Sequence, residues 1–351
     1  MKTQQRIPIT TIKAKANQSH VSDEADEDAR WEAAAIKVGL SACLAGHEVR
    51  YNGGHTYSKL CGKKFKPHFQ FQTFCPEVAA GFGTPRATLR LIGTPDKPTL
   101  SWSNDAYDET NDTLTQKLNN GFKDKLTQFS ELDGYILMKN SPSCGLERVK
   151  VYQENGYPHQ ERTSGIFASA LKQAFPLLPI EEEGRLQDAA LRENFILRVY
   201  AHHYFRKEVL DNPSVHNLLK FHSRYKYVLM AHHQQNYRIL GRMLANTSYQ
   251  DLSILIDDYF ALFMKTIAKP ANRKNHTNTL MHILGYLKRD VAPQARRAIA
   301  DIILKYRQGQ IPLITPLTLL KHYIDQNGNA YIKAQRYLEP YPESLGLRNS
   351  L

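Results

Sequence analysis

The sequence predicts an α/β, Rossmann-like N-terminal catalytic domain followed by an all-α C-terminal domain. Between residues 36 and 180, short apolar runs alternate with stretches of helical period, which is typical of strands interleaved with helices. From residue 185 onward, long helical periods follow one another without a run of comparable strand character. The chain of 351 residues is also long enough for two domains of ordinary size.

The composition is that of an ordinary globular protein, with 42% hydrophobic and 23% charged residues. Four cysteines, all within the first 144 residues, are too few for a disulfide framework, so we expect reduced thiols and a cytoplasmic location. No run of 18 apolar residues occurs, which argues against a membrane partner. Residues 1–35 include an acidic run at 23–28 and have no sustained period, so we expect a flexible tail.

Three strands and two helices are expected in the first domain. The strands lie at 37–40, 69–74 and 134–138, and each is apolar or alternates at period two. Helical spacing of apolar residues predicts helices over 111–129 and 165–175. Ligands of such sheets bind beyond the carboxyl ends of the strands, so the residues that follow the three strands are the first candidates for a site.

The second domain, over residues 185–345, is expected to be helical throughout. Proline residues divide it, and the apolar periods between them predict helices over 187–210, 213–245, 249–268, 276–289 and 293–308. Three glutamates and a glycine at 181–184 precede it, and we interpret them as a break between the two domains.

Three cysteines, Cys43, Cys75 and Cys144, come soon after the three predicted strands. They are 32 and 69 residues apart, which matches neither a zinc finger nor a ferredoxin-type run. Each lies on a loop with glycine or proline, and the sheet would bring all three to one edge. Three thiolates without a fourth nearby ligand suit a 4Fe-4S cluster with one open iron better than structural zinc, although three unrelated buried cysteines are compatible with the same spacing.

The settings of these cysteines resemble, in order, the three signature motifs of the thiouracil desulfurase family. The matching segments are Ser-Ala-Cys-Leu-Ala-Gly at 41–46 with Arg-Tyr-Asn-Gly at 50–53, Cys-Pro-Glu at 75–77 with Pro-Arg at 85–86, and Ser-Pro-Ser-Cys-Gly at 141–145. The second half is similar to the YbgA-like domain, for example in Arg-Glu-Asn-Phe at 192–195 and His-Ile-Leu-Gly-Tyr at 282–286. Fused in this order, the two halves resemble the tRNA 4-thiouridine desulfidases.

The resemblance implies removal of sulfur from thiolated uridine in tRNA, with a 4Fe-4S cluster on Cys43, Cys75 and Cys144 as the catalyst and the second domain as the tRNA binder. Hydrolysis of a C=S bond needs no net electron transfer, but it needs a proton acceptor for water and a donor for the departing sulfur. Glu77 and Ser141, each within three residues of a cysteine, are the candidates for these catalytic roles. The alternative is that Glu77 braces its loop and Ser141 caps a turn.

Further candidates lie beside the same loops. We expect Arg50, Asn52 and Arg86 to bind the substrate through a base edge or a phosphate. The alternative for Arg86 is an ion pair with a neighbouring carboxylate. Cys61, in a lysine-rich loop, is either a fourth ligand that would close the cluster or a spare thiol, and its loop favours the spare thiol.

Positive charge is concentrated in the second half, where residues 176–351 carry 24 lysines and arginines against 15 acidic residues. Such an excess is typical of a polyanion partner. If 213–245 form one helix, a basic stripe on one face would follow the phosphate backbone of RNA. The residues of this stripe are Lys220, Arg224, Arg238 and Arg242. The alternatives are a solvated helix face or an RNA surface at the basic run 63–66.

The leading hypothesis is a cytoplasmic tRNA 4-thiouridine desulfidase with no membrane or DNA partner. Competing hypotheses are a desulfurase of free thiouracil, for which the second domain would have no role, a non-catalytic iron–sulfur protein that binds RNA, and a zinc-dependent hydrolase. Ten residues separate His222 from His232, so we expect these histidines to pack or form hydrogen bonds rather than bind a metal.

Overall fold

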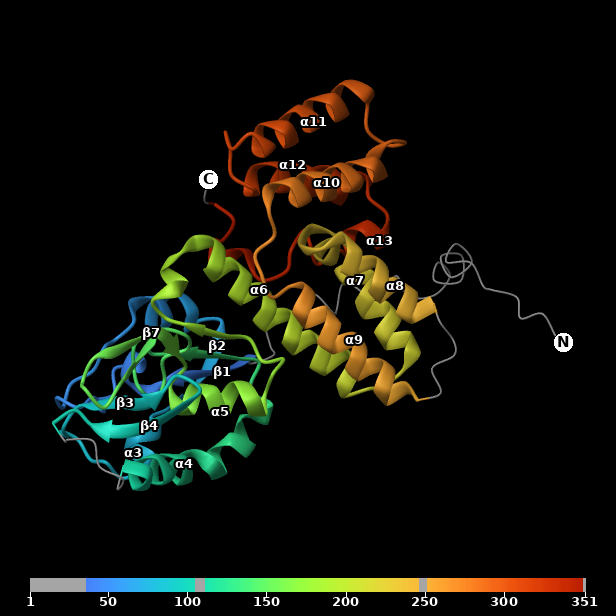
Figure 1. The fold of residues 1–351 in the computed structure, drawn as a ribbon. Coiled ribbons are helices and arrows are strands. Elements are labelled where there is room, and N and C mark those ends of the chain that lie inside the picture. Colours follow the sequence, from blue (N-terminus) through green and yellow to red (C-terminus); the bar gives the residue numbers. More distant parts are fainter. Residues whose placement is uncertain (1–35, 105–110, 246–250, 350–351) are drawn as a thin grey trace.

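The structure, a computed structural model, describes residues 36–104, 111–245 and 251–349. Its N-terminal part contains two four-stranded sheets with helices, and its C-terminal part is helical (Figure 1). The expected order of an α/β region and a helical region is therefore confirmed, whereas the Rossmann-like detail stays a prediction. The tail expected at 1–35 lies outside the described residues.

The first sheet is parallel and has the strand order β2-β1-β5-β8. Its strands are β1 Ile36–Ser41, β2 Phe69–Phe74, β5 Gly134–Leu137 and β8 Ile180–Glu182. The three strands expected from the sequence are thus present. The break expected at 181–184 coincides with the end of β8 and the turn after it. The carboxylates of this segment find donors inside the protein, since Glu182 accepts from the Leu146 amide at 2.7 Å and Glu181 from Arg185 Nε at 2.7 Å.

A second sheet, which the sequence analysis did not predict, has the order β4-β3-β6-β7. Its strands are β3 Leu89–Thr94, β4 Lys97–Trp102, β6 Val149–Tyr152 and β7 Pro158–Thr163. The central pair β3 and β6 is parallel, and the two outer pairs are antiparallel. The polar segments at its two edges explain why no strong apolar period marks it in the sequence.

Helices from different parts of the chain cover the two faces of the first sheet (Figure 1). On one face lie α4 Asn111–Gln128 and α5 Ile166–Ala174, and on the other lies α6 Ala189–Phe205. The ring of Phe167 in α5 lies 5.7 Å from that of Tyr135, and the ring of Tyr200 in α6 lies 5.9 Å from that of Phe69. The core of the helical part is therefore continuous with the sheet, and the domain limits at 180 and 185 stay a prediction.

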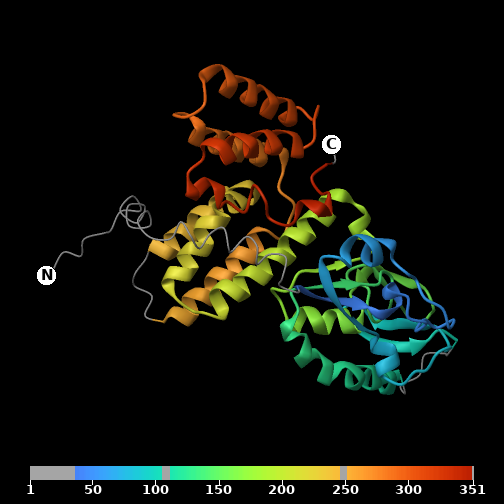
Figure 2. The same ribbon diagram turned by 180° about the vertical axis from the view of Figure 1, so that it is seen from behind.

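Seven further α-helices follow α6 in the described part of the chain. They are α7 Val215–His232, α8 Gln234–Ala245, α9 Leu252–Thr266, α10 Arg273–Leu284, α11 Pro293–Arg307, α12 Ile314–Asn327 and α13 Ala330–Lys333. Seen from behind, the orange and red helices α10, α11 and α12 stack at the end of the molecule far from the sheets (Figure 2). No helix within the described ranges has both the length and the apolarity needed to cross a membrane.

The single helix expected over 213–245 is wrong, because the chain breaks at His233. The backbone of this residue is extended, with φ −156° and ψ 102°. Its ring Nδ1 accepts the amide of Asn236 at 3.1 Å, so the side chain caps the start of α8. The four residues of the expected stripe therefore lie on two separate helices, α7 and α8.

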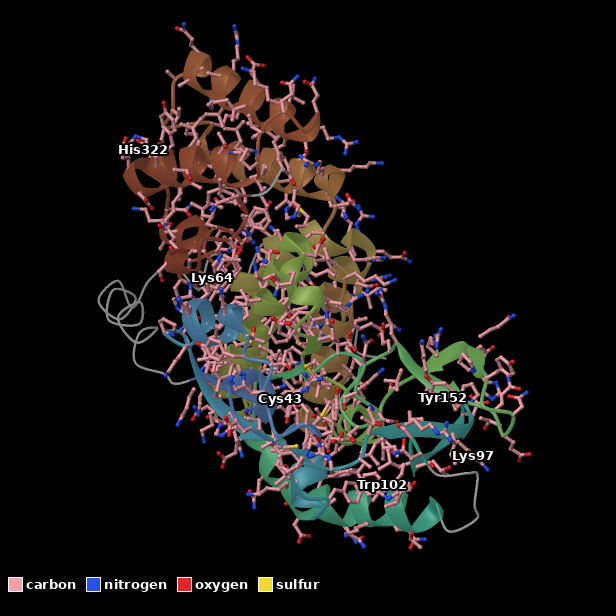
Figure 3. All side chains as sticks on the ribbon, turned by 90° about the vertical axis from the view of Figure 1, so that its left-hand side faces the viewer. Cys43, Lys64, Lys97, Trp102, Tyr152 and His322 are labelled. Carbon is pink, nitrogen blue, oxygen red and sulfur yellow. The ribbon has the colours of Figure 1, made fainter. Side chains whose placement is uncertain are left out.

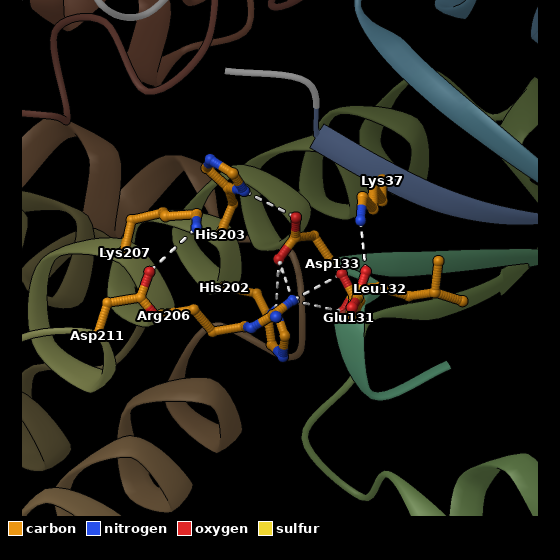
Figure 4. A network of polar contacts seen from close by, with 9 residues as sticks. All are labelled: Lys37, Glu131, Leu132, Asp133, His202, His203, Arg206, Lys207 and Asp211. Carbon is orange, nitrogen blue, oxygen red and sulfur yellow. Dashed lines mark hydrogen bonds and ion pairs between the residues drawn. The ribbon is translucent and has the colours of Figure 1, made fainter. Parts of the chain in front are cut away.

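A buried polar network fastens α6 to the amino end of the first sheet (Figure 4). Asp133, which directly precedes β5, is 2% exposed and accepts from Nδ1 of His203 at 2.7 Å and of His202 at 3.3 Å. Arg206 adds a hydrogen bond to the same carboxylate at 3.1 Å. Burial alone would raise the pKa of Asp133, but the hydrogen bonds from the two histidines hold it well below its usual range.

Candidate active site

The three cysteines lie together at the carboxyl edge of the first sheet. Cys43 belongs to the 3-10 helix η1, Ala42–Ala45, which follows β1. Cys75 follows β2 directly and precedes the short helix α3, Pro76–Ala79, and Cys144 lies on the loop after β5. Because β2, β1 and β5 are parallel neighbours, their ends bring these side chains to one space, as the sequence led us to expect.

All three cysteines line one pocket of about 330 Å³. Charged and polar residues from several loops complete its wall, among them Arg50, Tyr51, Glu77, Arg86, Lys139 and Ser141. Within the described ranges, no group of three or more His, Cys, Asp or Glu side chains is placed to hold a single metal ion.

Burial raises the pKa of all three thiols. The pKa of Cys43 rises to about 11, through burial first and then through the nearby Cys75. That of Cys144 lies well above its ordinary value for the same two reasons, and that of Cys75 is raised by burial. The thiols on their own are therefore neutral at pH 7, and ligation of a metal group would release a proton from each.

The loop that carries Cys144 is held by hydrogen bonds to its backbone. Oγ of Ser141 accepts the amides of Ser143 at 3.2 Å and of Cys144 at 3.1 Å. The amide of Ile166, at the start of α5, donates to the carbonyl of Pro142 at 3.0 Å. Ser141 thus caps this turn, which was the alternative to its catalytic role, and its hydroxyl hydrogen remains available for one further partner.

That partner is Glu77, whose two carboxylate oxygens are both engaged at the pocket wall. Oε1 accepts from Oγ of Ser143 at 2.8 Å and from Oγ of Ser141 at 3.4 Å. Oε2 forms an ion pair with Arg86. The carboxylate is therefore fixed between the loops of Cys75 and Cys144 while still lining the pocket.

Arg86 ties three loops around the pocket. Its side chain is 5% exposed, and Nη1 donates to the carbonyls of Val49 at 3.0 Å and Gly83 at 2.9 Å. Its own amide donates to the carbonyl of Tyr51 at 2.8 Å. The ion pair considered for Arg86 is thus present, and a contact with substrate stays a prediction.

The other two expected substrate residues differ in position. Arg50 lines the pocket, with its guanidinium 5.5 Å from the centre of the Tyr51 ring. Asn52 is exposed and is not among the residues that line the pocket. Its Oδ1 accepts the amide of Gly54 at 3.2 Å, so the structure gives Asn52 a role in shaping the turn.

Cys61 lies apart from the pocket. It belongs to the π-helix η2, Leu60–Phe65, and is wholly buried in the core between the sheet and the C-terminal helices. Burial raises the pKa of its thiol to about 12. This position agrees with the spare thiol that the sequence favoured.

Three residues of the pocket wall and one that supports Glu77 were not predicted from the sequence. Tyr51, Lys139 and Asn140 line the pocket, and Ser143 makes the shortest hydrogen bond from a hydroxyl to Glu77. Lys139 and Asn140 lie two and three residues after the end of β5, so the rule that ligands bind beyond strand ends was a usable signal. The contact of Ser143 with Glu77 joins segments 66 residues apart and has no local signal in the sequence.

His222 and His232, in the second half of the chain, both have protein partners. Nδ1 of His222 lies 3.0 Å from the hydroxyl of Tyr259, and Nδ1 of His232 lies 2.8 Å from the carbonyl of Val228. The hydrogen-bonding role expected for them is therefore present.

Family models match both parts of the chain. The model described as 2-thiouracil desulfurase matches residues 38–183, and the model described as a protein of unknown function (DUF1722) matches residues 226–342. Together they cover most of the described elements.

Individual proteins are similar to parts of the chain. The uncharacterized protein YbgA of Escherichia coli is 35% identical over 159 residues, which cover 45% of this chain and 94% of that protein. The uncharacterized protein YbbK of Bacillus subtilis is 31% identical over 137 residues, which cover 38% of this chain and 89% of that protein. A solved structure of the 4Fe-4S-dependent thiouracil desulfidase TudS matches 45% of this chain and 97% of that chain, at 24% identity and a TM-score of 0.33.

Proposed function

Because the chain belongs to the 2-thiouracil desulfurase family through residues 38–183 and to the family of YbgA through its C-terminal part, we propose that it is a tRNA 4-thiouridine desulfidase. It removes sulfur from thiolated uridine in tRNA and leaves uridine. The observation that carries the proposal is the pocket at the sheet edge, into which three cysteines and Glu77 converge. Soft sulfur ligands and a proton acceptor are the two kinds of group that this reaction needs in one place.

A 4Fe-4S cluster on Cys43, Cys75 and Cys144 fits the residues of this pocket. Thiolates are the usual ligands of such clusters. The hydroxyl of Tyr135 supports the fit, since it is buried and has no hydrogen-bond partner in the described part of the chain. Burial first, and then the three cysteines, raise the pKa of Tyr135 well above its ordinary value, so this hydroxyl keeps its proton and can donate a hydrogen bond. When bound, a cluster with one open iron supplies a thiophilic Lewis acid for a thiocarbonyl sulfur.

The protein's own residues manage the protons of the reaction. Water adds to the thiocarbonyl carbon, the C–S bond breaks, and the two hydrogens of water leave with sulfide, so no electron is gained or lost. Glu77 accepts the first proton at Oε1, where the 3.4 Å contact with Ser141 is the longest and the easiest to replace. Ser141 then passes a proton to the departing sulfur, while Arg86 and Ser143 hold the carboxylate in place.

The choice of tRNA over free thiouracil rests on the fusion with the helical part and on its positive charge. The RNA-binding roles expected for four residues of α7 and α8 stay predictions, and their surroundings differ. Arg238 and Arg242 are exposed on α8. Arg224 on α7 pairs with Glu208 at 3.2 Å, and Lys220 also has a partner.

The test uses the full chain, purified and reconstituted without oxygen, and tRNA that contains 4-thiouridine. After incubation without a reductant, the tRNA is digested and its nucleosides and the released sulfide are quantified. We expect 4-thiouridine to disappear, with equal amounts of uridine and sulfide formed. The Cys43→Ala variant, treated identically, is the control for desulfuration that does not depend on the pocket.

Two other outcomes would contradict the proposal. Conversion of free 2-thiouracil with no change in the tRNA would favour a desulfurase of the free base. Binding of tRNA without loss of sulfur from either substrate would favour an iron–sulfur protein that binds RNA without catalysis.

A further inference from the structure

Arg50, which lines the pocket, and the four exposed lysines that follow it in the chain form a group on the α/β part that we call the basic band. Between residues 46 and 68 the chain carries five lysines and arginines and one glutamate. The band consists of Arg50, Lys59, Lys63, Lys64 and Lys66. The four lysines are exposed, and no carboxylate in the described residues lies within ion-pair distance of them. The positive charge of this segment is therefore not neutralised locally.

The band is fixed to the turn that carries the first cysteine. The amide of Thr56 donates to the carbonyl of Cys43 at 3.0 Å, and that of Ser58 to the carbonyl of Leu44 at 2.9 Å. Directly afterwards, η2 packs its apolar side chains into the core and against η1, and it leaves its lysines in solvent. In Figure 3, Lys64 lies between Cys43 and the C-terminal helices. The lysine-bearing segment is thus tied through residues 56 and 58 to the turn of Cys43, which lines the pocket.

At its pocket end the band meets an exposed aromatic side chain. Tyr51 lines the pocket, is 42% exposed and lies beside Arg50. The turn that presents it is held by the amide of Gly53, which donates to the carbonyl of Arg50 at 2.9 Å, and by Arg86. A cationic track with an aromatic face is the arrangement by which many proteins hold exposed nucleotides.

The basic stripe that was expected on the helical part is interrupted. The break at His233 separates α7 from α8, and Arg224 on α7 is already paired with Glu208. The basic band of the α/β part, in contrast, includes Arg50 of the pocket wall.

We propose that the basic band binds the phosphate backbone of the RNA next to the nucleotide whose base enters the pocket, and that Tyr51 stacks on that base. This inference rests on the proposed function and deepens it, because it places RNA contacts in the α/β part. The lysines contribute charge without reading sequence, so different tRNAs can be held in the same way. The flat ring of Tyr51 selects a planar base over a phosphate or a ribose.

The test compares two triple variants of the full chain that lose the same charge. The band variant is Lys63→Gln, Lys64→Gln and Lys66→Gln. The control variant changes three exposed lysines of β4, α4 and α5: Lys97→Gln, Lys123→Gln and Lys172→Gln. Affinity for unmodified tRNA is measured over a range of salt concentrations. We expect the band variant to bind about tenfold more weakly at low salt and to lower the slope of log affinity against log salt by roughly two to three, since each lost phosphate contact lowers it by about one.

Several outcomes would overturn the inference. One is a salt slope and an affinity that are equal in the band and control variants, which would move the RNA surface to the helical part. Another is a loss of free 2-thiouracil turnover in the band variant alone, because that substrate has no phosphate and such a loss would indicate damage to the pocket. Failure of the proposed function would give a different result. A wild-type chain that binds tRNA through the basic band but leaves 4-thiouridine intact would support the binding surface and contradict the desulfidase activity.

Substitution of Tyr51 tests the stacking contact. Tyr51→Phe keeps the aromatic face, whereas Tyr51→Leu keeps an apolar side chain of similar size without it. We expect the Leu variant to raise KM for thiolated tRNA about tenfold and the Phe variant to leave it near the wild-type value. Equal KM values for the two variants would exclude a stacking role.

Discussion

Titratable groups are buried both at the cysteine edge of the first sheet and inside the C-terminal helices, and the two regions differ in what these groups face. At the sheet edge, three thiols and Glu77 face a shared pocket. In the helices, His222 and His276 each face one hydroxyl, that of Tyr259 at 3.0 Å and that of Tyr337 at 2.8 Å. Buried titratable groups therefore occur in both regions. The candidate site differs because several of these groups face the same pocket.

The largest expected effect is at the cysteine edge. Replacing Cys43, Cys75 or Cys144 singly by alanine removes one of three ligands, so we expect the variants to lose the roughly four iron atoms of a cubane cluster and all measurable desulfuration. Iron content, visible absorbance and turnover are measured on protein handled without oxygen.

Cys61→Ala is the matched control, because Cys61 is buried outside the pocket. We expect it to keep the iron and most of the activity. Loss of iron in a correctly folded Cys61→Ala protein would refute the three-cysteine ligand set.

A smaller loss is expected at Glu77, which does not hold the cluster. Glu77→Gln keeps the shape of the side chain but removes the proton acceptor, so turnover should fall by about 10²-fold while the iron content stays unchanged. Glu147→Gln, an exposed glutamate three residues beyond Cys144, is the control and should be as active as the wild type. Wild-type turnover in Glu77→Gln would transfer the role of proton acceptor to another group.

On the opposite edge of the sheet, the Asp133 network should affect stability and not the site. Asp133→Asn leaves the donors of His202, His203 and Arg206 without a charged acceptor in a buried place, so the free energy of unfolding in urea should fall by about 3 kcal/mol. The iron content of the folded variant should match that of the wild type. Glu131→Gln, which removes a solvent-exposed ion pair with Lys37, should change stability little, and an equal loss in both variants would contradict the role given to Asp133.

The smallest effect concerns the pH dependence of stability in the helical part. Burial lowers the pKa of His222 to about 4 and also lowers that of His232, whereas an unfolded chain has histidines near 6.5. As the pH falls below about 6.5, histidines of the unfolded chain take up protons that the same histidines of the folded chain do not. Their contribution to the free energy of unfolding is therefore complete at neutral pH and decreases as the pH falls toward their pKa in the folded protein. Between pH 7 and pH 5, His222 should account for up to about 2 kcal/mol of the loss.

Urea unfolding of the wild type and of His222→Gln at the two pH values measures this contribution. The variant should lose less stability than the wild type on acidification. A wild-type stability that rises at pH 5, or an identical loss in both proteins, would be inconsistent with a buried neutral histidine.

The parts of the fold that the sequence predicted are those with strong local patterns. β1, β2 and β5 are compact runs that end at the cysteine motifs. The second sheet was not predicted, because strands such as β7 are polar and mostly exposed and have no apolar period. The break before α8 was missed because a histidine ring caps the helix and no proline or glycine marks the position.

The candidate site was likewise predicted where motifs carry it and missed where contacts are tertiary. The cysteines, Glu77 and Arg86 were found through their motifs. The bond from Ser143 to Glu77 joins two loops, and Tyr51 reaches the pocket only because the turn after η1 folds back over it, so neither contact can be read from one segment alone. The rule that ligands bind beyond strand ends was applied to the cysteine motifs but not to Lys139 and Asn140, which follow β5.

The buried helix α6 fixes how the α/β part and the helical part are placed relative to each other. This helix joins the two parts and is packed against the sheet on one side and against the C-terminal helices on the other. Relative motion of the two parts would open a close-packed core, so α6 is a rigid connection between them and not a flexible linker. At 1.5 Å per residue, its 17 residues span about 26 Å. Because this connection is rigid, the distance between the cysteine edge and the C-terminal helices is fixed, so a ligand that contacts both has to reach across a constant separation.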